Sequence, residues 1–374
     1  MRQIFLPLVS LAVLAACARK ASEASTQPPT PGADTAAAPA DTAPADTATL
    51  TFAFAGDMML GTTFPDSLTD THLPADRGRR LFEHVGEITR RVDIAGANLE
   101  GSFLEGPGRR RPVTNPNTYF IFRMPLDFVD RFGEAGFDVL GIANNHINDF
   151  GQPGRSSTMA TIRGAGLSVV GLKDSCETAV FERKGLKIGV TQFGHGDNNL
   201  DVTDLDELRR VVQDLHGHCD IVVVSFHGGA EGGSLTHVPF EPEIYVGEQR
   251  GNVAEFARTA VDAGADLVFG HGPHVPRGAE LYRDRLIMYS LGNFCTPYRI
   301  SVAGNCGLAP LPEVRIARDG SFIEGRIHSF VQVRGRGPQP DSTHRAAALI
   351  GRMSLADFPE SPLSITSDGL LLRK

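Results

Sequence analysis

The chain has 374 residues, a formal net charge of −8 and five cysteines, and 41% of its residues are hydrophobic. This length suits one large domain or two domains, and the apolar content is enough for a sizeable core. The acidic balance argues against nucleic acid as a partner, because phosphate binding needs clustered Lys and Arg. The first 48 residues differ in composition from the rest and are considered first.

The N-terminus has the pattern of an export signal followed by a lipid attachment site. Arg2 precedes an apolar run from Ile4 to Ala16, which is shorter than the ~20 residues that a membrane-spanning helix needs. The run ends in Leu14-Ala15-Ala16-Cys17, which resembles the bacterial lipobox, where the cysteine is acylated. We expect residues 1–17 to be a lipoprotein signal peptide with Cys17 as the lipidation site. The alternative is an ordinary signal peptide with a chance cysteine.

A polar spacer follows the signal. Residues 18–48 contain no Val, Ile, Leu or aromatic residue and are dominated by Ala, Pro, Thr, Ser and Asp. Such a segment cannot bury enough apolar surface to offset the entropy lost on ordering. We expect a disordered linker that tethers a folded domain to a membrane, outside the cytoplasm in the bacterial cell envelope.

The remaining cysteines are Cys176, Cys219, Cys295 and Cys306. None has the Cys-x-x-Cys spacing of a metal site, and four cysteines allow three pairings between which the sequence does not choose. Structural or free thiols are therefore the default expectation.

From residue 49 onward the pattern alternates between strands and helices, which predicts an α/β fold. The candidate strands are rich in Val, Ile and Phe: Thr51–Ala55, Ile94–Ala97, Asp138–Ile142, Ser168–Gly171, Lys187–Gln192, Ile221–Phe226, Leu267–Phe269 and Leu286–Tyr289. The candidate helices have apolar residues at helical spacing: Leu81–Val92, a segment starting at Pro125, Leu205–Leu215 and Asn252–Ala263. Ile221-Val222-Val223-Val224 is apolar on both faces, as expected for a central strand.

The C-terminal part has a different pattern. Glu313 to Val333 is typical of antiparallel hairpin strands, and after Arg334 the pattern weakens into a Gly/Pro-rich tail. We therefore expect one domain over residues 49–335 and a C-terminal extension over residues 336–374.

Polar side chains follow most of the predicted strands directly. They include Asp57, Glu100, the run Asn144-Asn145-His146, His227 with Glu231, and His271 with His274. Each one alone is more often a turn, a cap or a satisfied polar group than a ligand. Together they would meet at one edge of a sheet, where α/β folds place their sites. Oxygen and nitrogen donors of this kind suit Mn, Zn or Fe, which predicts a metal centre.

These motifs resemble a known family. Phe54-Ala55-Gly56-Asp57-Met58-Met59-Leu60-Gly61, Ala97-Asn98-Leu99-Glu100-Gly101, Ala143-Asn144-Asn145-His146, Gly270-His271-Gly272-Pro273-His274-Val275 and Tyr289-Ser290-Leu291-Gly292-Asn293-Phe294 are similar, in this order, to the CapA family of bacterial capsule synthesis proteins, which carries the PGA_cap domain. That family is associated with poly-gamma-glutamate capsule and belongs to the calcineurin-like metallophosphatase superfamily. The resemblance implies a four-layer α/β/β/α sandwich.

The resemblance also implies roles for individual residues. Its metal ligands map onto Asp57, Glu100, Asn145, His227, His271 and His274, and His146 maps onto an outer histidine that acts as the catalytic acid. It implies one or two divalent ions, drawn from Mn, Zn, Fe or Mg. Two departures leave the number of ions open: Met59 stands where the superfamily has a histidine, and the last histidine pair is spaced by two residues instead of one.

The substrate is less defined than the site. We expect weaker, substrate-binding roles for Asn98, Asn144, Glu231 and the basic cluster Arg109-Arg110-Arg111, which could receive an anionic polymer such as poly-gamma-glutamate. The first hypothesis is a lipid-anchored hydrolase of a phosphoester or an amide, in capsule synthesis or export and working with other membrane proteins. The alternative is a non-catalytic accessory or binding protein for an anionic envelope polymer, so enzymatic activity stays open.

Overall fold

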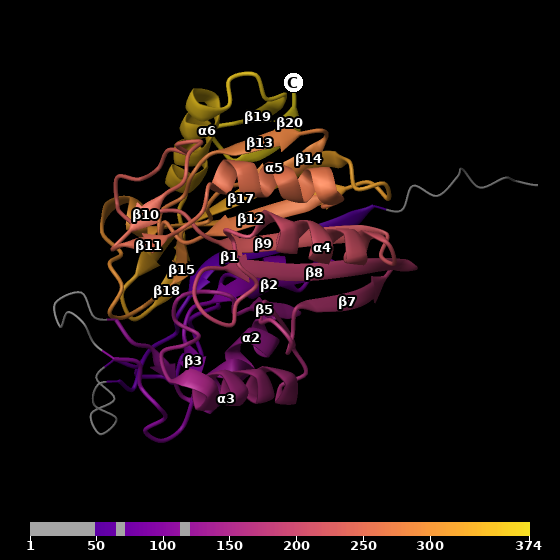
Figure 1. Ribbon diagram of the computed structural model, residues 1–374. Coiled ribbons are helices and arrows are strands. Elements are labelled where there is room, and N and C mark those ends of the chain that lie inside the picture. The colour runs from indigo at the N-terminus through magenta and orange to yellow at the C-terminus, as the bar shows by residue number, and fades with distance from the viewer. Residues whose placement is uncertain (1–48, 65–71, 113–119) are drawn as a thin grey trace, which may run out of the picture. The chain divides into compact units, whose positions relative to one another are not determined.

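Two β-sheets lie face to face between two layers of helices in the computed structural model, which describes residues 49–64, 72–112 and 120–374 (Figure 1). The predictions for residues 1–48, including the signal peptide, Cys17 and the linker, lie outside these ranges. Within them, no helix combines the length and the apolar content needed to cross a membrane.

The first sheet has ten strands. Its main path runs β19 (Leu363–Ile365), β20 (Leu370–Arg373), β17 (Phe322–Val333), β16 (Leu308–Ile316), β1 (Leu50–Met58), β2 (Ile94–Leu99), β5 (Val139–Gly141) and β6 (Ser168–Val170). Two strands join it at the side: β15 (Asn293–Cys295) pairs with β1, and β18 (Gly337–Pro340) pairs with β17. The pairs from β1 to β6 are parallel, whereas β16 and β17 form the antiparallel hairpin that the sequence predicts.

The second sheet has six strands. Its order is β13 (Ala279–Tyr282), β14 (Arg285–Met288), β12 (Leu267–His271), β9 (Ile221–His227), β8 (Leu186–Gly194) and β7 (Thr178–Arg183). The four central strands pair in parallel, and the two edge strands are antiparallel to their neighbours. Two short pairs lie outside these sheets: β3 (Ser102–Phe103) with β4 (Arg123–Met124), and β10 (Ile244–Tyr245) with β11 (Glu248–Gln249).

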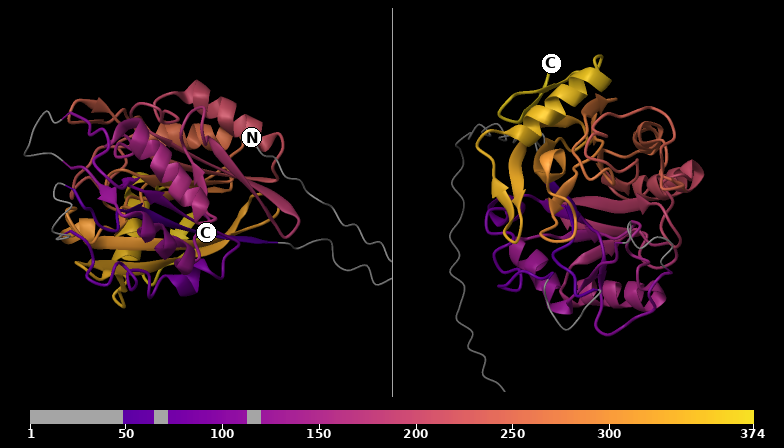
Figure 2. Two further views of the ribbon diagram at one scale, coloured as in Figure 1. Left: turned by 90° about the horizontal axis from the view of Figure 1, so that it is seen from below. Right: turned by 90° about the vertical axis from the view of Figure 1, so that its left-hand side faces the viewer.

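Three apolar cores separate the four layers, which confirms the predicted α/β/β/α sandwich. Between the sheets, Phe54 of β1 stacks on Phe269 of β12 with ring centres 4.4 Å apart. Along β9, Val223 faces this inner core, while Val222 and Val224 face the outer helices, as the two-faced apolar run predicts. The helices α1 (Gly86–Thr89), α2 (Val129–Ala135) and α3 (Gly151–Gly164) cover the first sheet, and α4 (Leu205–His216) and α5 (Val253–Ala263) cover the second (Figures 1 and 2).

The two helices over the second sheet form where the sequence places them, because their ends carry capping residues. The side chain of Asp204 accepts hydrogen bonds from the backbone of Asp206 and Glu207 at the start of α4, and Asn252 caps α5 in the same way. Gly264 ends α5 with a positive φ of 120°, a conformation that suits glycine. A 3-10 turn (Leu126–Phe128) after Pro125 leads into α2, close to the predicted start.

Other parts of the outer layers differ from the predictions. The predicted helix over Leu81–Val92 is wrong: only Gly86–Thr89 is helical, and the chain before it forms consecutive tight turns. Leu81 and Val85 are still buried. The apolar spacing therefore predicts which side chains pack into the core, but not that the backbone forms a helix. The sequence analysis missed α3, which contains Gly151, Pro153 and Gly154, and these residues disfavour a helix interior.

Residues 336–374, set apart in the sequence as an extension, add β18, α6 (Arg345–Asp357), β19 and β20 to the first sheet and its surroundings. Helix α6 packs on β13, β16 and β17, and buries Ala347 and Ile350 between the sheets. These residues are therefore part of the fold although the sequence pattern weakens after Arg334, because Ala-rich and Gly/Pro-rich segments gain order here from tertiary packing.

A buried ion pair fixes the long loop between β9 and α5. Arg277, which is 1% exposed, donates to both carboxylate oxygens of Glu243 at 2.7 Å. The same guanidinium donates to the backbone oxygen of Leu235, and Glu243 accepts from the backbone nitrogen of Ala230. The pair therefore holds both sides of the loop that carries Glu231.

We expect Arg277→Met to lower the free energy of unfolding by about 3–5 kcal/mol, because it leaves the Glu243 carboxylate buried without its partner. Urea denaturation measures this change. The control is Arg209→Met, which removes an exposed pair with Asp206 on α4 and should cost less than about 1 kcal/mol. Equal small losses in both variants would contradict the stabilising role of the buried pair.

Candidate metal centre

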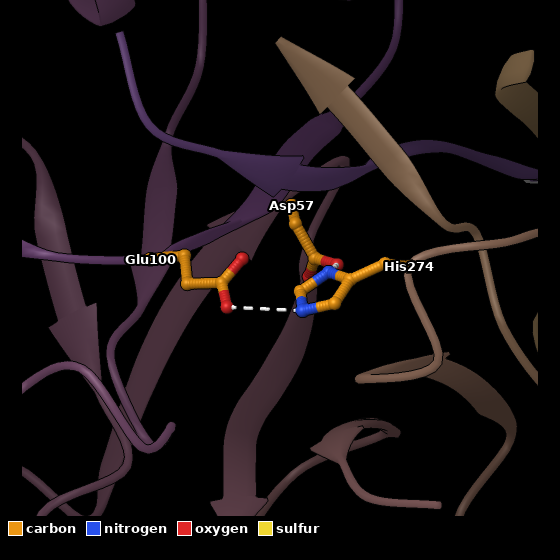
Figure 3. A group of neighbouring side chains, drawn as sticks. All are labelled: Asp57, Glu100 and His274. Carbon is orange, nitrogen blue, oxygen red and sulfur yellow. Dashed lines mark hydrogen bonds and ion pairs between the residues drawn. The ribbon is translucent and has the colours of Figure 1, made fainter. Parts of the chain in front are cut away.

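Two carboxylates and a histidine converge where strands of the two sheets end. Asp57 lies near the end of β1, Glu100 directly follows β2, and His274 lies on the loop after β12. One ligand atom from each lies within 4.8 Å of the others (Figure 3). His274 approaches Asp57 Oδ2 through Nδ1 at 2.9 Å and Glu100 Oε1 through Nε2 at 3.5 Å.

Two more histidines reach this cluster from the second sheet. His227 and His271 are paired residues on the neighbouring strands β9 and β12, so the sheet register places them side by side. The Nδ1 atom of each lies 3.7 Å from Asp57 Oδ1, and both side chains are fully buried. Parallel pairing in each sheet thus brings the strand ends to one place.

Several buried polar atoms of this cluster lack a hydrogen-bond partner in the described part of the chain, which bears on whether a cation fits there. Both oxygens of Glu100, Oδ1 of Asn145, Nε2 of His227 and both ring nitrogens of His271 are buried without a hydrogen-bond partner among the described residues. Unpaired buried acceptors are costly, and those of Glu100, His227 and His271 lie around Asp57 and His274. They are also the oxygen and nitrogen donors that a divalent metal ion takes, so the residues fit such an ion.

Burial shifts the pKa of several groups in the cluster, and the shifts of His227 and His271 suit a metal ligand. Burial raises the pKa of the Glu100 carboxyl group to about 7; the negative charge of Asp57 adds to this effect and His274 opposes it. Burial lowers the pKa of His271 to about 4 and that of His227 well below its usual value, so both rings are neutral near pH 7 and can offer lone pairs. Burial acts in the same sense on His274, but the Glu100 and Asp57 carboxylates raise its pKa well above the ordinary value.

The amides of Asn98 and Asn144 bind within the protein. Asn98 donates to Asp57 Oδ1 at 2.8 Å and accepts from Asn144 and from Gln192, both at 3.0 Å. Asn144 also donates to the backbone oxygen of Leu99. Both asparagines are fully buried, so the structure gives them a role in orienting Asp57 and the loop of Asn145, whereas the sequence analysis expects contact with substrate.

His146 has a carboxylate partner that the sequence analysis missed. Asp149, three residues later and fully buried, lies 2.9 Å from His146 Nδ1 through Oδ2. Burial lowers the pKa of His146, but the Asp149 carboxylate more than reverses this and raises it. Arg111 donates to the other oxygen of Asp149 at 2.8 Å, so it supports this pair. The spacing Asn-Asn-His-x-x-Asp was the signal available in the sequence.

A cavity of about 420 Å³ opens beside the cluster. Its described lining includes Glu100, His146, Glu231 and His274, together with aromatic walls from Phe120, Phe122 and Tyr245, and no Lys or Arg. Arg109 and Arg110 are exposed, and Arg110 lines a separate cavity of about 720 Å³ with Arg77 and Arg123. Arg111 therefore has a structural role, whereas Arg109 and Arg110 lie outside the cavity beside the metal centre.

A further histidine, His195, was also missed. It follows β8, whose last residue Gly194 pairs with His227, so it reaches the same edge as the other ligands. Its ring lies 5.5 Å from the ring of His227, and its Nε2 is buried without a hydrogen-bond partner among the described residues. Burial lowers its pKa to about 3. Its place after a predicted strand was the signal.

The four cysteines in the described part of the chain form no disulfide. Cys176, Cys219, Cys295 and Cys306 are all free thiols, and the first three are buried. Burial raises the pKa of Cys295 above its ordinary value. Cys306 lines the cavity beside the metal centre.

The fold of this chain is similar to that of solved structures. A structure described as a novel phosphatase from Mycoplasma pneumoniae superposes with a TM-score of 0.50 and 15% sequence identity, over 79% of this chain and 96% of that one. At this identity the likeness concerns the fold alone, and it agrees with the metallophosphatase-like sandwich.

Two capsule biosynthesis proteins are similar to this chain in sequence. The capsule biosynthesis protein CapA of Bacillus anthracis is 27% identical over 264 residues, which is 66% of this chain and 59% of that protein. The PGA biosynthesis protein CapA of Bacillus subtilis is 29% identical over 266 residues, or 66% of this chain and 63% of the relative. The match thus spans less than two thirds of either relative. The family described as "Bacterial capsule synthesis protein PGA_cap" matches residues 51–298, and this chain belongs to it.

Proposed function

We propose that this protein is a metal-dependent hydrolase that cleaves a phosphoester or an amide in the synthesis or export of an anionic capsule polymer. The observation that carries the proposal is the set of unpartnered ligand atoms from Glu100, Asn145, His227 and His271, gathered beside an oriented acid, His146. Relatives named for capsule and PGA biosynthesis support the choice of pathway. Poly-gamma-glutamate is accordingly the polymer we propose.

The ligand residues and the acid have separate tasks. Asp57, Glu100, Asn145, His227, His271 and His274 would hold the ion. A bound divalent cation supplies Lewis acidity, which lowers the pKa of water and polarises a substrate oxygen. Asp149 fixes the His146 ring through Nδ1, so that Nε2, 3.8 Å from Glu100 Oε1, is directed toward the cluster. His146 donates a proton to the leaving group from Nε2.

A second candidate function is polymer binding without catalysis. One observation favours it: the cavity beside the metal centre has Glu231 and no described Lys or Arg, whereas Arg77, Arg110 and Arg123 line another cavity. Arg123 is 7% exposed, and its guanidinium donates to Thr63 and to the backbone oxygen of Gly106. Such a surface could hold carboxylates of a polymer that is never cleaved.

Turnover separates the two functions. We expect the purified chain, loaded with Mn²⁺, to hydrolyse a generic phosphodiester such as bis-p-nitrophenyl phosphate, or to shorten poly-gamma-glutamate. His227→Ala should abolish turnover because it removes a metal ligand. The control is His237→Ala, an exposed residue paired with Asp357, which should keep full activity. Metal bound without turnover of either substrate would favour the accessory function.

Asp149→Asn tests the orientation of His146. The amide keeps the size of the carboxylate but cannot stabilise a positive imidazole ring, so we expect kcat to fall by about 10–100-fold with KM little changed. Steady-state kinetics with Mn²⁺ measures both constants. The control is Asp127→Asn, whose exposed carboxylate pairs with Arg77. A rise in KM with unchanged kcat would assign Asp149 to substrate binding instead.

We also propose that the protein is anchored to a cell-envelope membrane through Cys17. The support comes from the sequence alone: the apolar run before Leu14-Ala15-Ala16-Cys17 and the polar linker after it. We expect bacteria that express the full chain and grow with an alkyne fatty acid to label the protein. Cys17→Ser should remove the label, while Cys306→Ser should keep it. Equal labelling of both variants would refute lipidation at Cys17.

A further inference from the structure

We propose that Glu231 is a ligand of the metal centre, on the side of His274 Nε2 that Glu100 also faces. This inference rests on the metal-binding part of the proposed function. It replaces the weaker role in substrate binding that the sequence suggests for Glu231.

The position of Glu231 relative to His274 carries the inference. Glu231 Oε2 lies 3.6 Å from His274 Nε2, the same nitrogen that lies 3.5 Å from Glu100 Oε1. Asp57 approaches the other ring nitrogen at 2.9 Å. Three carboxylates therefore surround one imidazole ring, each from a different strand end or loop.

The charge balance favours a cation at this point. The positive groups in the described lining of the cavity are the rings of His274 and His146, the latter 3.8 Å from Glu100 Oε1, and no Lys or Arg lines it. Arg250 offsets part of the charge of Glu231, since its Nη1 donates to Oε1 at 2.9 Å. The remaining negative charge is what a divalent ion neutralises, and carboxylate oxygens are ligands that such ions accept.

The protein also holds Glu231 in place before any ligand arrives. The Arg250 side chain is 3% exposed and fixes Oε1, which leaves Oε2 directed toward His274. The preceding residue, Ala230, donates its backbone N–H to Glu243, the carboxylate of the buried Arg277 pair. A solvated loop acid would have neither constraint. Glu231 is instead 18% exposed and held on both sides.

Strand β1 and the residue after it supply a single hard ligand, so another element has to supply more. Asp57 is followed by Met58 and Met59, whose thioethers are soft, weak donors, so β1 itself offers only the Asp57 carboxylate as a hard ligand. Glu231 approaches His274 from the loop after β9, the strand that also carries His227. Strand β9 and the loop that follows it would thus each deliver one ligand to the site.

Mn²⁺ binding to the full chain tests the inference directly. We expect Glu231→Gln to weaken Mn²⁺ binding and to raise the dissociation constant at least tenfold. Titration calorimetry and the EPR signal of free Mn²⁺ measure this constant. The glutamine oxygen can still accept from Arg250, so the loop should stay in place, and the melting temperature without metal checks this. The control is Glu248→Gln, which removes the other carboxylate partner of Arg250 at 3.0 Å and should leave the affinity within twofold.

The outcomes distinguish this inference from the proposed function. Mn²⁺ binding of equal strength in wild type and Glu231→Gln would overturn the role of Glu231 and leave the hydrolase proposal standing. Strong binding that depends on Glu231, without turnover of any substrate, would support the ligand and overturn the hydrolase. A wild-type chain that binds no Mn²⁺ would overturn both.

Discussion

The buried carboxylate of Asp57 is the group on which the arrangement of the site depends. It is fully excluded from solvent, accepts a hydrogen bond from Asn98 and lies within 3.7 Å of three histidines. An isolated carboxylate in such a place would be too costly to keep charged. His274, whose Nδ1 lies 2.9 Å from Asp57 Oδ2, and the bound cation that we propose offset this cost.

The sandwich brings these groups together through strand pairing and close backbone approach. Asp57 pairs with Asn98 on one side and Asn293 on the other, while His227 pairs with His271 in the second sheet. Gly56 permits this contact, because a Cβ atom there would lie 2.0 Å from the backbone oxygen of Gly292. The Asp57 backbone nitrogen donates to that same oxygen at 2.9 Å. The precision of the site therefore comes from rigid sheet edges, and the loops after β9 and β12 add Glu231 and His274.

Much of this could be predicted from the sequence where local signals agree with tertiary packing. The central strands were predicted from their apolar runs, and α4 and α5 from apolar periodicity with capping residues. Polar residues after those strands predict a metal centre, and the resemblance to the capsule-synthesis family implies which of them are its ligands. The Leu81–Val92 segment kept its apolar face without becoming a helix, and α6 gains its order from contacts with β13, β16 and β17. Asp149 and His195 were not assigned, because each lies just outside a recognised motif or predicted strand and its contact with His146 or His227 is seen only in the fold. The burial of Asn98 and Asn144, and the separation of Arg110 from the cavity beside the metal centre, are likewise properties of three-dimensional packing.

Diffraction from crystals grown with Mn²⁺, recorded at a wavelength where Mn²⁺ scatters anomalously, tests the central claim most directly. We expect an anomalous peak within bonding distance of Glu100 and His274, between the ends of β1, β2, β9 and β12. Absence of a peak there, at Mn²⁺ concentrations that saturate the chain, would show that the clustered carboxylates and histidines do not form a metal centre.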